Sequence, residues 1–142
     1  MTMMKYGLMC AGFFWIALGL FHFPRIWTTV FAQWDAELNV LPPLSRKLIN
    51  TVLVALCLLG VALGLMTIVL AGGNSHFDRP QVWFLFFCFL FWLWRTVWQI
   101  LYFPVRKLNA GPGLISLHVA LIVIFVINTA AYAAPVVAAL IQ

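Results

Sequence analysis

The chain has 142 residues, of which 65% are hydrophobic and only 8% are charged. A soluble domain is about half apolar and about a quarter charged, and a small globule leaves much of its chain exposed, so a water-soluble globule is excluded. The net charge is +5, and the basic residues lie between apolar runs. We therefore expect these residues to face a membrane surface, and we expect no nucleic-acid partner.

The first apolar run covers about residues 6–23. A helix needs roughly 20 residues to cross the hydrocarbon core of a bilayer. Because the run follows Lys5, it resembles a signal peptide, but it ends in Phe23 and Pro24 without a small-residue cleavage site. We expect it to be a retained membrane-spanning helix.

Residues 26–39 are more polar and follow this first span. Their large apolar side chains recur at helical spacing, at Trp27, Phe31, Trp34 and Leu38. This pattern predicts a short amphipathic helix that lies in the headgroup region. The alternative is that the first span continues past Pro24 with a kink.

Three further apolar runs are long enough to span a bilayer, and membrane-spanning strands would be about half as long. They cover about residues 48–71, 82–103 and 114–141. Pro42 and Pro43 interrupt the chain before the second span, for which Ser45 is the expected N-cap.

Two glycine-containing turns, at residues 72–76 and 109–113, join the last three spans. Connections this short make consecutive helices antiparallel. The predicted fold class is therefore an all-α membrane protein. Its single domain, residues 1–142, is an up-down bundle of four transmembrane helices with an interfacial helix after the first span.

The positive-inside rule predicts the orientation of the spans. The first and third connections together hold Arg25, Arg46, Lys47, Arg106 and Lys107. The N-terminus and the second connection hold only Lys5 and Arg79. We expect a protein of the inner (plasma) membrane with the first and third connections in the cytoplasm and both termini outside.

Small residues on two spans predict where helices pack. Gly60 and Gly64 form a small-xxx-small pair in the second span, and Gly12 and Gly19 lie on one face of the first. Glycine at such positions lets helix backbones approach closely.

Polar side chains of all four spans fall in the half of the membrane nearer the first and third connections. Such residues on an otherwise apolar span should face the protein interior. Together with an aromatic residue on the polar face of the third span, they form the predicted ligand-binding set, which is His22, Asn50, Trp92, Arg95, Gln99 and His118.

Arg95 is the most informative member of this set. An arginine at the centre of a span costs about 2.5 kcal/mol or more. The acids of the chain, Asp35, Glu37 and Asp78, all lie in connections. Arg95 therefore either reaches towards the cytoplasmic headgroups and stacks on Trp92 or Trp98, or it binds the acidic group of a ligand.

We infer a small membrane protein that is an accessory subunit or binds an apolar, partly anionic ligand, such as a lipid or a quinone-like molecule, in the cytoplasmic half. The expected partners are membrane lipids and either another membrane protein or a second copy. No enzyme motif is present, so we expect no catalytic activity. A small dimeric transporter is an alternative.

A second alternative is a redox protein with a b-type haem. His22 and His118 would be its axial ligands, and Arg95 would bind a propionate. The competing interpretation is that both imidazoles bond to backbone or water. No metal site is predicted from the cysteines, which lie at different depths, at Cys10, Cys57 and Cys88.

Overall fold

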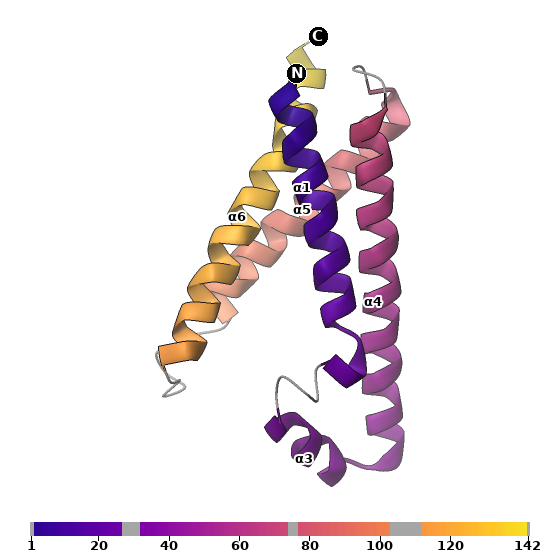
Figure 1. Cartoon of the computed structure of the whole chain (residues 1–142), viewed down its shortest axis with the longest axis vertical. Coiled ribbons are helices and arrows are strands. Elements are labelled where there is room, and N and C mark those ends of the chain that lie inside the picture. The colour runs from indigo at the N-terminus through magenta and orange to yellow at the C-terminus, as the bar shows by residue number, and fades with distance from the viewer. Residues whose placement is uncertain (1, 27–31, 74–76, 103–111, 142) are drawn as a thin grey trace. The chain divides into compact units, whose positions relative to one another are not determined.

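The computed structural model describes residues 2–26, 32–73, 77–102 and 112–141, and in this part of the chain it contains helices and no strand (Figure 1). The helices are α1 (Thr2–Phe21), α3 (Ala32–Val40), α4 (Pro43–Gly72), α5 (Arg79–Tyr102) and α6 (Pro112–Ile141). All except α3 are long and apolar enough to cross a membrane. The four predicted helical spans are therefore confirmed.

The side chains that cover these helices also suit a lipid environment. Val69 on α4, Trp83 on α5 and Ile127 on α6 are 72%, 60% and 60% exposed. Large apolar patches of this kind are unfavourable on a monomer in water but suit contact with lipid tails. The chain is a small multi-pass membrane protein.

The start of α4 differs from the prediction. The helix begins at Pro43, its N-cap is Pro42, and no side chain caps it. Ser45 lies inside the first turn, so the predicted Ser45 N-cap is wrong. A proline at the first helical position has a suitable φ angle and lacks an N–H that would have no partner there, which explains the earlier start.

The start of α5 is fixed by a reciprocal capping pair that was not predicted from the sequence. The Gln81 backbone N–H donates to Asp78 Oδ1 over 3.0 Å, and the Asp78 N–H donates to Gln81 Oε1 over 3.0 Å. This capping box satisfies two N–H groups at the helix start, so α5 begins at Arg79, before the expected residue 82.

The predicted amphipathic segment is helical where the structure describes it, in α3. Leu38 is buried there, whereas Glu37 and Asn39 are exposed. Residues 27–31 lie outside the described residues. The placement of α3 in the headgroup region stays a prediction.

The chain divides into two compact units. One comprises Met9–Gly73 and the other comprises Met1–Leu8 together with Asn74–Gln142, so that α1 contributes to both. The single up-down bundle of all four spans stays a prediction.

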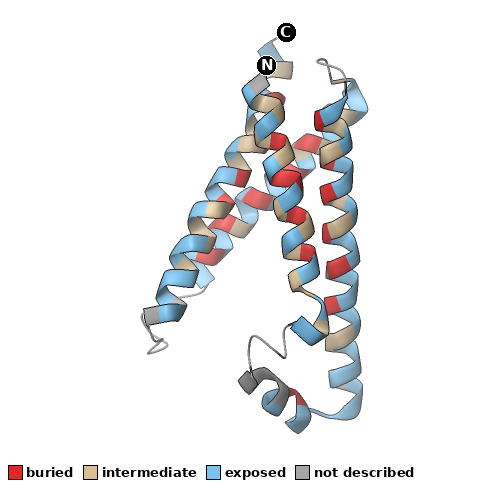
Figure 2. Cartoon of the chain, in the orientation of Figure 1, coloured by how far each residue is buried: buried red, intermediate tan, exposed pale blue. Residues whose placement is uncertain are grey.

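In the unit formed by Met9–Gly73, α1 and α4 touch through their backbones. A Cβ atom added to Gly60 would lie 2.6 Å from the Gly19 Cα, and one added to Gly64 would lie 2.6 Å from the Gly12 carbonyl oxygen. The buried residues of α4 recur along one stripe of the helix, which runs through Leu53, Cys57, Gly60, Gly64, Thr67 and Ala71 (Figure 2). The predicted close approach of the glycines is confirmed.

In the other unit, α5 and α6 pack antiparallel. Gln99, near the end of α5, contacts His118, near the start of α6, whereas Trp92 contacts Phe125 further along. Trp92 and Phe125 are fully buried, and their ring centroids are 5.4 Å apart. The first residues of α1 belong to this unit through Gly7, where an added Cβ would lie 3.8 Å from the Ala131 Cβ.

Candidate ligand-binding site

The polar residues of α5 and α6 meet along their shared interface. We call this set the polar seam, and it comprises Arg95, Thr96, Gln99, His118, Asn128 and Thr129. Two side-chain pairs connect the helices there. Gln99 Nε2 lies 2.9 Å from His118 Nδ1, and the hydroxyl oxygens of Thr96 and Thr129 lie 3.3 Å apart.

The two threonines stabilise the helix pair and leave no free donor for a ligand. The Thr96 hydroxyl donates to the Trp92 carbonyl oxygen over 2.8 Å, and the Thr129 hydroxyl donates to the Phe125 carbonyl oxygen over 2.8 Å. A hydroxyl has one proton, and both protons are already shared with the backbone. The donors that remain available for a ligand at the seam are therefore those of its other members.

Gln99 orients the imidazole of His118. The Gln99 amide N–H donates to His118 Nδ1, which places the proton of the neutral ring on Nε2. Gln99 is 6% exposed and His118 is half-buried, so Nε2–H is a donor near the end of the seam. The structure thus joins two members of the predicted ligand-binding set.

Arg95 is half-buried, and its guanidinium lies over the Phe125 ring, with Cζ 5.3 Å from the ring centroid. The observed ring is on the neighbouring helix, whereas the sequence led us to expect Trp92 or Trp98. The nearer end of α5 is at Tyr102. Cα–Cβ bonds in a helix tilt towards its N-terminus, so the Arg95 side chain leaves the helix in the direction away from Tyr102. Trp98 instead stacks on Tyr102, with ring centroids 4.4 Å apart.

The charge of Arg95 has no acidic counterpart in the spanning helices. Every Asp and Glu of the chain lies outside α1, α4, α5 and α6. A guanidinium offers its N–H groups in a planar fork that matches carboxylate or phosphate oxygens. The seam can therefore bind an oxyanion at Arg95.

His22 and Asn50, the other two members of the predicted set, belong to the unit formed by Met9–Gly73. The His22 ring donates from Nδ1 to the Leu18 carbonyl oxygen over 2.6 Å, as expected for an imidazole bonded to backbone. Asn50 is half-buried near the start of α4. Their membership in one site with Arg95 stays a prediction.

The haem alternative also stays a prediction. It would require a change in the hydrogen bond between Gln99 and His118. A haem iron binds the lone pair of a ring nitrogen. For His118 Nε2 to bind iron, Nδ1–H would have to donate to Gln99 Oε1, with the amide turned from the arrangement described above. Among the described residues, no group of three or more His, Cys, Asp or Glu side chains could hold a metal ion.

Asn128, which is 3% exposed on α6, was not predicted from the sequence. Its Nδ2 donates to the Ile124 carbonyl oxygen over 2.8 Å, and its Oδ1 has no hydrogen-bond donor among the described residues. The available signal was the polar pair Asn128-Thr129 at the centre of an otherwise apolar run. A buried acceptor without a donor costs about 1–3 kcal/mol, which makes Asn128 a candidate functional residue.

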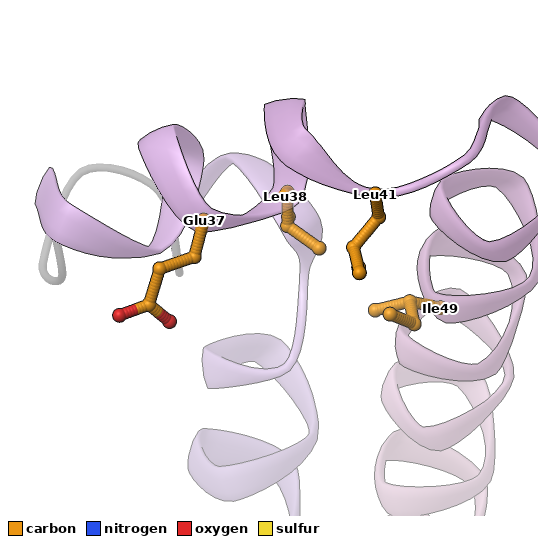
Figure 3. Close-up of a pocket in the computed structure, with 4 residues that line it drawn as sticks. All are labelled: Glu37, Leu38, Leu41 and Ile49. Carbon is orange, nitrogen blue, oxygen red and sulfur yellow. The ribbon is translucent and has the colours of Figure 1, made fainter.

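A cavity of about 180 Å³ lies between α3 and the first turns of α4. It is lined by Glu37, Leu38, Leu41 and Ile49, and Leu41 and Ile49 point towards each other, with the Glu37 carboxylate to one side (Figure 3). Its lining is mainly apolar and its charge is negative. It is therefore unsuited to the anionic ligand that Arg95 suits.

No known protein family matches this chain, and no similarity to a curated protein or to a solved structure is found.

Proposed function

We propose that this membrane protein binds an anionic amphiphile, with the acidic group of the ligand at Arg95. The observation that supports this proposal is a half-buried guanidinium on a spanning helix, placed over the neutral ring of Phe125, in a chain whose spans contain no acid.

The energies of these interactions favour a ligand. Placing an arginine at the centre of a span costs about 2.5 kcal/mol or more. A cation–π contact recovers about 0.5–2 kcal/mol. An oxyanion that accepts hydrogen bonds from the guanidinium would offset the remainder, since charge-assisted bonds of this kind are among the strongest in proteins.

A lipid fits this requirement better than a quinone. A quinone offers carbonyl acceptors but no negative charge, whereas a lipid phosphate offers both. The exposed aromatic face beside Arg95, with Phe91 37% and Trp98 38% exposed, supplies apolar contact for the rest of an amphiphile. We further propose that the site lies in the cytoplasmic half of the inner membrane and that the chain acts there as an accessory lipid-binding protein.

The test compares two lipids that differ in charge and share the phosphodiester. The purified protein is titrated with phosphatidylmethanol, which is anionic, or with phosphatidylcholine of the same acyl chains, and bound lipid is counted by native mass spectrometry. We expect phosphatidylmethanol to bind more tightly, and we expect Arg95→Gln to remove that preference.

Arg79→Gln is the matched control, because it removes the same charge from an exposed position at the start of the same helix. It should keep the preference. Equal binding of the two lipids by the wild type, or an Arg95→Gln variant that still prefers phosphatidylmethanol, would refute the proposed function.

A further inference from the structure

Arg95 of α5 and Asn128 of α6 both make contacts at the turn of α6 that contains Ile124 and Phe125. The guanidinium lies over the Phe125 ring. The Asn128 amide reaches back one turn to donate to the Ile124 carbonyl oxygen, so it lies beside the same turn of α6. Side chains of a helix lean towards its N-terminus, which explains why the amide returns to this level.

The two groups have opposite hydrogen-bonding character. Arg95 offers only donors, whereas the Asn128 Oδ1 is a buried acceptor with no donor among the described residues. The threonine protons at this level are shared with backbone carbonyls. Gln99 and His118 pair with each other, near the end of α5 and the start of α6.

We propose that Asn128 is a specificity-determining residue that selects anionic amphiphiles with a hydroxyl group next to the acidic group, as in the glycerol headgroup of phosphatidylglycerol. This inference rests on the proposed function. The phosphate binds Arg95 and the hydroxyl donates to Asn128 Oδ1. Arg95 contacts the Phe125 ring and the Asn128 amide bonds to the Ile124 carbonyl, so both groups lie at one turn of α6, where one headgroup would contact both.

A movement of the amide is part of this proposal. Protein atoms cover Oδ1, so a ligand hydroxyl reaches it only when the amide turns about its Cβ–Cγ bond. That torsion has broad minima in asparagine, and the turn exchanges one hydrogen bond to the Ile124 carbonyl for one from the ligand. Arg95 is only half-buried, so the headgroup enters the seam from the side of its guanidinium.

The experiment extends the lipid titration by one headgroup. Phosphatidylglycerol and phosphatidylmethanol carry the same charge and the same phosphodiester, and only the first has headgroup hydroxyls. We expect the wild type to bind phosphatidylglycerol about tenfold more tightly, which corresponds to roughly 1.4 kcal/mol. Asn128→Leu should bind the two anionic lipids equally, whereas Asn39→Leu, the same change at an exposed position on α3, should keep the tenfold preference.

The outcomes separate this inference from the proposed function. If the wild type binds the two anionic lipids equally but prefers both to phosphatidylcholine, Asn128 does not select a hydroxyl and the proposed function stands. If neither anionic lipid is preferred to phosphatidylcholine, both proposals fail. Equal binding of the two anionic lipids by the wild type overturns the assignment even if Asn128→Leu does not fold. A preference for phosphatidylglycerol that survives in folded Asn128→Leu also overturns the assignment.

Discussion

Gly60→Ala should destabilise the protein, although alanine is the better helix former. Replacing a glycine inside a helix by alanine gains roughly 1 kcal/mol of helix propensity. At Gly60, however, the added Cβ would lie 2.6 Å from the Gly19 Cα and 3.2 Å from the Trp15 carbonyl oxygen. Non-bonded carbons prefer about 3.5–4.0 Å, so α1 and α4 must separate by about 1 Å at this level.

This separation has a definite cost. Overpacking of a tight interface costs about 1–3 kcal/mol, and the contact at Gly60 is with backbone, which cannot rotate away. It also loosens the neighbouring contact of Gly64 with Gly12, because both lie on the same pair of helices. After the gain in helix propensity of roughly 1 kcal/mol is subtracted, we expect a net loss of up to about 2 kcal/mol in the free energy of unfolding.

The assay is unfolding in mixed detergent micelles, followed by far-ultraviolet circular dichroism. Gly72→Ala is the matched control, because it lies on the same helix and an added Cβ would have no atom within 4 Å. It should leave stability unchanged or raise it slightly. If Gly60→Ala were as stable as Gly72→Ala, the backbone contact between α1 and α4 would be wrong.

Three further predictions concern the seam and the membrane topology. Gln99→Leu and His118→Leu should each destabilise the protein. A double-mutant cycle in the same unfolding assay should give a coupling free energy of about 1 kcal/mol, which is in the upper part of the range for hydrogen bonds between membrane helices. A coupling of zero would contradict the 2.9 Å contact between Gln99 and His118. Phe125→Leu should lower the free energy of unfolding by about 1–3 kcal/mol, because it removes the ring under Arg95 and beside Trp92. Phe87→Leu, at an exposed position, should change it little. Equal losses for the two variants would refute the packing of Phe125 between α5 and α6. A C-terminal reporter fusion that is active only in the cytoplasm should be inactive, and activity would reverse the predicted orientation.

The four spans could be predicted because the membrane imposes a simple constraint. Each backbone polar group in lipid must be bonded within its own helix, so an apolar run of about 20 residues has one stable conformation. Glycine spacing was equally readable, since only glycine permits the approach of Gly19 to Gly60. These features depend on local sequence and hardly on which helices are neighbours.

The site was only partly predictable because it depends on contacts between helices. The sequence marked Arg95 and Gln99 as polar residues on one face, but the choice of Phe125 over a nearby tryptophan depends on how α5 and α6 are aligned. Asn128 was missed because one asparagine in an apolar run resembles a packing residue. Only the structure shows that its oxygen is buried and has no donor in the described part of the chain.

The expected Ser45 cap failed for a local reason. Serine is a common N-cap, and the pattern suggested one. Pro43 was treated only as a helix breaker, yet at the first helical position a proline favours the helix. The same residue type therefore ends α3 and begins α4.

The central claim is that Arg95 holds the acidic group of a lipid, and the most direct test is a measured contact between the two. Solid-state nuclear magnetic resonance of arginine-¹⁵N-labelled protein in phosphatidylmethanol bilayers detects guanidinium nitrogens close to lipid phosphorus. Arginines near the headgroups contribute to this signal as well, so the informative quantity is the part that Arg95→Gln removes. We predict a nitrogen–phosphorus contact that disappears in Arg95→Gln and persists in Arg79→Gln. A signal that is unchanged by Arg95→Gln would contradict the account.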